Sequence, residues 1–263
     1  MTPPAERLEL WHEWISTHSF KVRIVLAEKG LAWTPHPISL FEIEQRTPAY
    51  LAINPAGEVP TLVHRGVKLY DSSPIAEYLD EVFPEPPLMP RDPVLRLQAR
   101  RWLKYHDGVA HLAVRDTSFQ LLYKPKFSAM PRAELEARMA RLPDEAKRKR
   151  FLEGANPQID WDALVRSTRA AEAVADRLES ALGTTGRWLA GDAFSLGDVA
   201  MASFADRVVN LGMEFLWETR PAAGDWARRL LARPGVQAAC PPAGERLPAP
   251  AADTIAELRR RLG

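Results

Sequence analysis

The sequence predicts an α/β domain followed by an all-helical domain, and three features support this prediction. Short strand-like runs alternate with short helical patterns over residues 1–82. The segment at 83–93 reads FPEPPLMPRDP, and its five prolines interrupt both helix and sheet, so we expect a linker there. Beyond it, long helical patterns replace the strands over 94–240, with an extended insertion near 123–158 and a tail at 241–263.

The first domain is expected to begin with strand, helix, strand and helix. These elements are predicted at Leu8 to Trp11, Phe20 to Lys29, Trp33 to Ser39 and Gln45 to Ile53. Gly30 is a C-cap for the first helix. The prolines within the second strand favour the edge of a sheet. The second helix must stop before Pro55, because the residue preceding a proline avoids helical angles.

The stretch from Asn54 to Asp80 completes this domain. Thr61 to Val63 and Val67 to Tyr70 are strand-forming runs separated by Arg65-Gly66, which predicts an antiparallel hairpin. Ile75, Tyr78, Leu79 and Val82 then recur at helical spacing after Asp71-Ser72. The complete order is therefore β-α-β-α-β-β-α.

Two features of this stretch suggest a ligand. If the bond between Val59 and Pro60 is cis, the N–H and C=O of Val59 stay unpaired by the sheet and can hold an extended peptide. The helix start at Ser72 offers free N–H groups and a positive dipole end, which suit a carboxylate. Together they predict a site for a small acidic peptide.

Val59-Pro60, Asp71-Ser72 and the following Ile-x-x-Tyr-Leu helix resemble the glutathione-binding half of the cytosolic glutathione transferases. The resemblance extends from about Leu8 to about Ala239. It implies a thioredoxin-like domain with a mixed four-stranded sheet, glutathione as co-substrate, a small hydrophobic electrophile as second substrate, and a homodimer.

The resemblance also assigns the glutathione subsites. Ser72 would hold the γ-glutamyl carboxylate, and Asp71 would face the ammonium group. The main chain of Val59, before Pro60, would pair with the cysteinyl backbone. Gln45 matches a zeta-class glutamine near the glycyl end.

The loop from Ile15 to Arg23 resembles the Ser-x-Cys-Ser-x-Lys/Arg-Val-Arg motif of the zeta class. Transfer requires the glutathione thiolate, which a hydroxyl donor and a helix N-terminus can stabilise. Ser16 falls on the serine that donates to the sulfur. His18 stands where the zeta class has a cysteine, so thiol exchange on the enzyme is doubtful. His18 and Ser19 are the other catalytic candidates, with helix capping or solvent exposure as their alternative roles.

In the helical half, Phe194-Ser195-Leu196 with Asp198 matches the helix-start motif of the family, and the insertion is similar to that of its bacterial β-etherase and dehalogenase-like branch. The charged run inside the insertion predicts a solvated helical excursion. Candidates for the second-substrate pocket are aromatic and histidine side chains, although most of them, taken singly, are better explained as core residues: Trp11, Trp14, Trp102, His106, Phe119 and Tyr123.

The composition argues against several classes of partner and site. Hydrophobic residues make up 46% and the net charge is +1, so nothing suggests nucleic acid or membrane as a partner. Cys240 is the single cysteine, which excludes an internal disulfide and a multi-thiolate metal site; no metal is expected. The start MTPPAERLELW lacks a secretory signal pattern, and a reducing cytoplasm fits best. The Pro- and Ala-rich tail after Pro241 is expected to be partly mobile.

Three functions remain open from the sequence. The leading one is a glutathione transferase acting by conjugation, β-aryl ether cleavage or dehalogenation. A second is a glutathione-dependent cis-trans isomerase of the maleylacetoacetate type, which His18 in place of cysteine disfavours. A third is a non-catalytic binding module that keeps the transferase fold.

Overall fold

The structure is a computed structural model that describes residues 7–246 and 248–263. It contains a mixed four-stranded sheet of order β2-β1-β3-β4. Strand β1 pairs in parallel with β2 and antiparallel with β3, and β3 pairs antiparallel with β4. The predicted edge position of the proline-containing strand is confirmed. The strands are β1 (Leu8–His12), β2 (Trp33–Pro37), β3 (Thr61–His64) and β4 (Val67–Tyr70).

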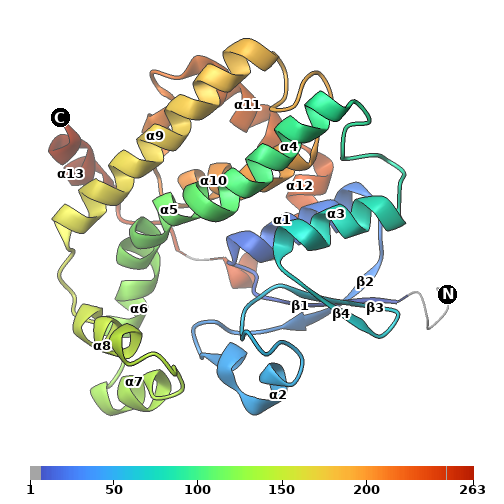
Figure 1. Cartoon of the computed structure of the whole chain (residues 1–263). Helices are drawn as coiled ribbons and strands as arrows, with labels where there is room; N and C mark the ends of the chain where they lie inside the picture. The colour runs from blue at the N-terminus through green and yellow to red at the C-terminus, as the bar shows by residue number, and fades with distance from the viewer. Residues whose placement is uncertain (1–6, 247) are drawn as a thin grey trace.

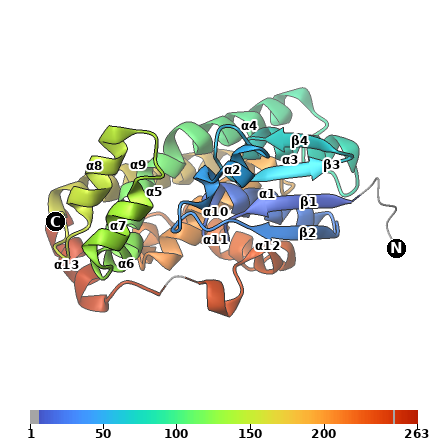
Figure 2. The same ribbon diagram turned by 90° about the horizontal axis from the view of Figure 1, so that it is seen from below.

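Helices cover both faces of this sheet. Helices α1 (Thr17–Glu28) and α3 (Ser72–Val82) pack on one face, and the short α2 (Pro48–Leu51) lies on the other (Figures 1 and 2). The layers meet through fully buried aliphatic side chains, among them Leu10 and Leu62. The predicted order β-α-β-α-β-β-α is confirmed, and with it the thioredoxin-like fold.

Two predicted helix boundaries are wrong. Helix α1 begins at Thr17 and not at Phe20, because Ser16 is its N-cap and accepts a hydrogen bond from Ser19 N at 3.2 Å. The helix expected at 45–53 is divided into a 3-10 turn, η2 (Glu44–Arg46), and α2. Thr47 is extended and caps the new helix at Pro48, where a missing N–H costs nothing.

The connection between the two halves is anchored by a buried ion pair. Lys29 Nζ lies 2.7 Å from Asp80 Oδ1. Asp80 also accepts hydrogen bonds from Leu88 N and Met89 N, and Leu88 O accepts one from Leu196 N at 2.8 Å. The Pro-rich segment, which forms neither helix nor strand over 83–92, is thus attached to both halves.

The second half is helical. The long helical patterns expected over 94–240 are present, and the first of them is interrupted by two π-helical turns. The elements are α4 (Pro93–Tyr105), η3 (His106–Ala110), α5 (His111–Ser118), η4 (Phe119–Tyr123), α6 (Lys124–Ser128), α7 (Arg132–Met139), α8 (Glu145–Gly154), α9 (Trp161–Thr185), α10 (Leu196–Asn210), η5 (Glu214–Trp217), α11 (Pro221–Leu231), α12 (Pro234–Ala239), η6 (Ala243–Glu245) and α13 (Ala252–Leu262).

Helix α10 forms the centre of this half and packs on α1, α4 and α11. The helix-start motif predicted here is confirmed as a capping box. The Asp198 carboxylate accepts a hydrogen bond from Ser195 N, and the Ser195 hydroxyl accepts one from Gly197 N. Asp198 is fully buried and also accepts hydrogen bonds from Leu189 N and Trp226 Nε1. Asp198 therefore holds together the start of α10, the loop at Leu189 and helix α11.

Part of the tail is helical. Residues 252–262 form α13, which packs against α9 and buries Leu258 and Leu262. These apolar residues recur at a spacing of four, which places both on one face of the helix. Among the described residues, no helix combines the length and apolar character needed to cross a membrane.

Candidate glutathione and electrophile site

The starts of α1 and α3 meet at one point. His18 Nδ1, in the first turn of α1, is hydrogen-bonded to Ser72 Oγ at 3.1 Å. Asp71, just before α3, has φ +63° and ψ +121°, a conformation that non-glycine residues rarely adopt. Two helix N-termini with their free N–H groups therefore converge where the sequence predicted a carboxylate.

The turn before β3 carries Val59. Asn54 Nδ2 donates to Glu58 O and Thr61 Oγ1, and Asn54 Oδ1 accepts from Ala56 N. Gly57 has φ +60°, and a side chain there would meet Gln45 O at 2.8 Å, so only glycine fits. The Val59–Pro60 bond is cis.

The backbone of Val59 has no hydrogen-bond partner among the described residues. Within the described parts of the chain, no hydrogen bond uses its N–H or C=O, since pairing of β3 begins at Thr61. These groups can accept an added peptide strand, as predicted. Gln45 lines the cavity between the two halves, and its Oε1 is buried without a partner among the described residues.

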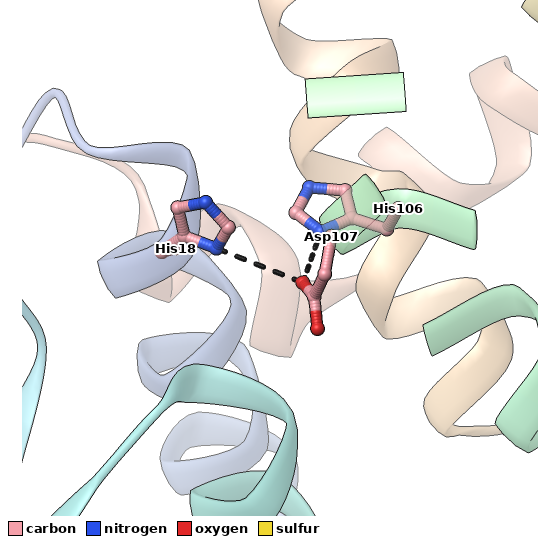
Figure 3. Close-up of side chains that lie close together, drawn as sticks. All are labelled: His18, His106 and Asp107. Carbon is pink, nitrogen blue, oxygen red and sulfur yellow. Dashed lines mark hydrogen bonds and ion pairs between the residues drawn. The ribbon is translucent and has the colours of Figure 1, made fainter. Parts of the chain in front are cut away.

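A polar network from the helical half closes the base of this site. Figure 3 shows His18 facing Asp107 and His106, which come from the η3 turn. His106 Nδ1 lies 3.0 Å from Asp107 Oδ1, and His18 Nδ1 lies 3.7 Å from the same oxygen. On the far side, His106 Nε2 is hydrogen-bonded to Ser203 Oγ at 2.7 Å. The network thus continues from the site into the core.

Lys21 supplies the positive charge of this network. Its side chain is fully buried, and its Nζ donates to Asp107 Oδ1 at 2.7 Å and to Ser73 Oγ at 2.8 Å. The ligand atoms of His18, His106 and Asp107 lie within 4.8 Å of one another, as in a cation site. The Lys21 ammonium already bonds the shared carboxylate, so a cation there would meet a like charge.

The environment keeps these histidines neutral. Burial lowers the pKa of His106 to about 3, that of His111 to about 4 and that of His18 to about 2, and neighbouring positive groups act in the same direction. Burial alone would raise the pKa of Asp107, but its hydrogen bond from His106 and the Lys21 ammonium hold it well below its usual range. The site therefore combines neutral imidazoles with one charged pair.

Ser16 lies at the edge of a different cavity. Its side-chain oxygen caps α1, and it lines a cavity of about 210 Å³ together with Trp14, Arg207 and Cys240. Its hydroxyl hydrogen is still able to donate outward. Burial raises the pKa of the Cys240 thiol, which makes that thiol a poor nucleophile. Ser19 is fully buried, and Glu13 N donates to its Oγ at 3.4 Å.

A larger cavity of about 630 Å³ lies between the two halves. The loop at 40–45 forms one wall, and the insertion with the end of α5 forms the other. Figure 1 shows α6 to α8 beside the α2 region of the thioredoxin-like half. The predicted residues Phe119 and Tyr123 both line this cavity, so the cavity suits an apolar second substrate.

The other pocket candidates lie elsewhere. Trp102 is 7% exposed and packs in the core between Tyr105 and α10, so its expected place in the pocket is wrong. His106 is fully buried and belongs to the polar network instead of the pocket wall. Trp14 lines the smaller cavity. Trp11 of β1 stacks on His36 of the edge strand β2 at 4.1 Å between ring centroids.

Sequence reasoning missed several residues of the site. Asp107, Ser73 and His111 were not singled out, although His111 Nδ1 is hydrogen-bonded to Thr17 Oγ1 at 3.0 Å. The signal available was the pattern His-Asp-x-x-x-His at 106–111, within the first helix beyond the linker. Its meaning depends on Lys21 and His18, which lie far away in the sequence.

Comparison with known families agrees with this geometry. Residues 15–82 match the glutathione S-transferase N-terminal domain, and residues 131–234 match the glutathione S-transferase C-terminal domain. The chain belongs to the glutathione S-transferase family.

Among its relatives, Protein LigF of Sphingobium sp. is 28% identical over 88% of this chain and 91% of that protein. The crystal structure of beta-etherase LigF superimposes with a TM-score of 0.78 at 27% identity, covering 88% of this chain and 98% of that one. Glutathione S-transferase Z1 of Arabidopsis thaliana is 46% identical, and maleylacetoacetate isomerase of Pseudomonas aeruginosa is 45% identical. These two matches cover 33% and 35% of this chain and span only 39% and 45% of those proteins.

Proposed function

We propose that this protein transfers glutathione to a hydrophobic electrophile bound between its two halves. The observations that carry the proposal are the convergence of the α1 and α3 starts and the unpaired backbone of Val59 in the turn before β3. This arrangement provides a place for one carboxylate and one extended peptide backbone, as γ-glutamyl-cysteinyl-glycine requires.

Each site residue has a role in this proposal. Ser72 and the N–H groups of α3 bind the γ-glutamyl carboxylate, and Asp71 faces its ammonium group. Val59, held by Pro60, pairs with the cysteinyl backbone, and Gln45 lies toward the glycyl end.

Ser16 donates to the sulfur and stabilises the thiolate at the start of α1, where the helix dipole also favours negative charge. Neutral His18 orders the base of the site through Ser72 and Asp107. Ser19 supports this loop from inside through its bond to Glu13 N.

The electrophile class follows from the cavity and the relatives. A volume of about 630 Å³ with five aromatic side chains in its wall suits an aromatic substrate. The full-length likeness to beta-etherase LigF supports cleavage of a β-aryl ether by thiolate attack, ahead of halide displacement. In either case the thiolate forms a C–S bond while the leaving group departs with the bonding electron pair.

A glutathione-dependent activity panel tests the proposal. The panel compares a β-aryl ether, an aryl halide, chlorodinitrobenzene and maleylacetone, with calorimetry for glutathione itself. We expect glutathione binding and turnover of the ether or halides. Turnover of maleylacetone alone would favour an isomerase, and absence of glutathione binding at millimolar concentration would favour a non-catalytic module.

Replacement of Ser16 tests its role within that activity. Ser16→Ala should lower turnover on the order of a hundredfold, since a single donor to a developing anion contributes that much, while glutathione affinity stays nearly intact. The substitution also removes the α1 cap, so Ser16→Thr, which keeps the hydroxyl, and Ser180→Ala on the exposed face of α9 are the controls. Unchanged turnover in Ser16→Ala would remove Ser16 from the mechanism.

We also propose a cytoplasmic homodimer, as the family resemblance implies. The exposed apolar residues Val94 and Leu97 on α4 and Val67 and Tyr70 on β4 support this. Helices α3 and α4 and strand β4 lie along one side of the molecule in both views (Figures 1 and 2). Light scattering should give twice the mass of the chain, and Leu97→Lys should shift it toward the monomer.

A further inference from the structure

Lys124 is a buried cation in the wall of the cavity between the two halves. The residue is 4% exposed. Its Nζ donates to the carbonyl oxygen of Gln158 and to Gln120 Oε1. Both acceptors are neutral, and an ammonium group has three N–H donors, so one donor remains for another partner. No carboxylate of the described residues lies within ion-pair distance of this ammonium.

The other buried lysines of the chain are paired differently. Lys21 and Lys29 each have a carboxylate oxygen at 2.7 Å. A buried ammonium without a directly bonded carboxylate is unfavourable, and burial lowers the pKa of Lys124 more than the attraction of the Asp160 carboxylate raises it. Among the lysines whose burial the structure describes, Lys124 is therefore the exception, and it lines the cavity between the two halves.

The acidic groups nearest the cavity already have partners of their own. Asp160 caps α9 by accepting from Ala163 N at 2.9 Å, and Asp116 pairs with Arg115 at 3.3 Å. Glu153 lies 3.8 Å from Lys149. The rest of the wall is largely aromatic, with Phe41, Phe119, Tyr123, Phe127 and Phe151.

We propose that Lys124 binds an anionic oxygen carried on the aromatic ring of the second substrate. This inference rests on the proposed transferase function and specifies its substrate class. The oxygen is either a carboxylate or phenolate substituent, or the aryloxide released by ether cleavage. In the second case the thiolate sulfur bonds to carbon, the C–O bond breaks, and its electron pair goes to the aryloxide oxygen, which accepts a hydrogen bond from Lys124.

Matched electrophiles test the proposal in the intact protein. Halide displacement from chlorodinitrobenzoate is compared with that from chlorodinitrobenzamide, which has the same ring without the charge. We expect Lys124→Met to lower kcat/KM for the benzoate about tenfold or more and to leave the amide within about twofold. Lys124→Arg should restore much of the loss, and Lys104→Met, an exposed lysine on α4, should change neither. Equal losses on both substrates would overturn the proposal.

Two further measurements complete the test. If Lys124→Met slows only a β-aryl ether and leaves the benzoate unchanged, the anion bound is the leaving aryloxide. Calorimetry with dinitrobenzoate, which has no leaving group, reports binding without chemistry. Binding of dinitrobenzoate that depends on Lys124, without any transferase activity, would support the anion site and reject the proposed function. Transferase activity in which Lys124→Met affects neither turnover of any substrate nor binding would support the proposed function and reject the anion site.

Discussion

His18 Nδ1 and Ser72 Oγ are hydrogen-bonded at 3.1 Å although 54 positions separate them in the chain. The bond joins the first turns of α1 and α3, which are the two helix ends proposed to receive glutathione. A γ-glutamyl carboxylate that binds Ser72 must share this hydroxyl with His18 or displace it. The contact therefore links the binding end of the site to the residue that replaces the zeta-class cysteine.

Loss of the Ser72 hydroxyl should weaken glutathione binding. Hydrogen bonds to charged groups contribute about 1.5–3 kcal/mol, so Ser72→Ala should raise the Kd for glutathione about tenfold or more by calorimetry. Ser73→Ala is the matched comparison, because Ser73 bonds Lys21 and Asp107 and not the proposed ligand. Ser73→Ala should lower the melting temperature of the protein and leave its Kd for glutathione close to that of the wild type. Equal affinities for wild type and Ser72→Ala would contradict the assigned subsite.

The bridge between the loop at 40–45 and α7 should control access to the electrophile cavity. Arg138 is paired with Glu42 at 2.9 Å and lies over the ring of Phe41 at 4.7 Å, across the cavity wall. We expect Arg138→Met to raise KM for the electrophile roughly threefold to tenfold and to leave KM for glutathione unchanged.

The control for this bridge is Arg132→Met on the same helix, where Arg132 pairs only within its own half of the molecule. Hydrogen exchange of the 40–45 loop should accelerate in Arg138→Met and not in the control. Unchanged exchange would show that the bridge does not hold the loop.

Removal of the Asp198 carboxylate should destabilise the helical half strongly. Its oxygens accept bonds from Ser195 N, Leu189 N and Trp226 Nε1 in a fully buried position. Asp198→Ala leaves these donors unpaired and should lower the free energy of unfolding by about 3 kcal/mol or more, measured by urea titration. Asp225→Ala on the surface of α11 should stay within about 0.5 kcal/mol. A small loss at Asp198 would mean that water replaces the carboxylate.

Stability should fall in acid because of the buried histidines. The pKa of His106 is about 3 in the folded protein against 6.5 in the unfolded chain. Below pH 6.5 the unfolded chain therefore takes up a proton that the folded protein does not. The free energy of unfolding should decrease by up to about 1.4 kcal/mol per pH unit and per histidine as the pH falls, and His106 should contribute nothing above that range.

Urea titrations from neutral pH down to about pH 5 measure this slope. His106→Asn should make it shallower without abolishing it, because two half-buried neutral histidines, His18 and His111, remain in the cluster. A wild-type stability that does not change over this range would contradict neutral burial of the cluster.

Much of the fold follows from local patterns. The hairpin at Arg65-Gly66 forms as predicted, because both residues have the positive φ values that such a turn needs. The start of α10 forms as predicted because Ser195 and Asp198 are close in sequence. The start of α1 was placed three residues late, because Ser16, Ser19 and Thr17 were all acceptable caps by residue type.

By itself the sequence determined the α/β and helical halves, the hairpin at Arg65-Gly66 and the helix start at Ser72, since each depends on neighbouring residues. Only the tertiary structure decided that His18 contacts Ser72, that Trp102 lies in the core while Phe119 lines the cavity, and that Lys124 faces that cavity without a carboxylate partner. Such relationships depend on packing between segments distant in the chain, which local propensity and spacing do not encode.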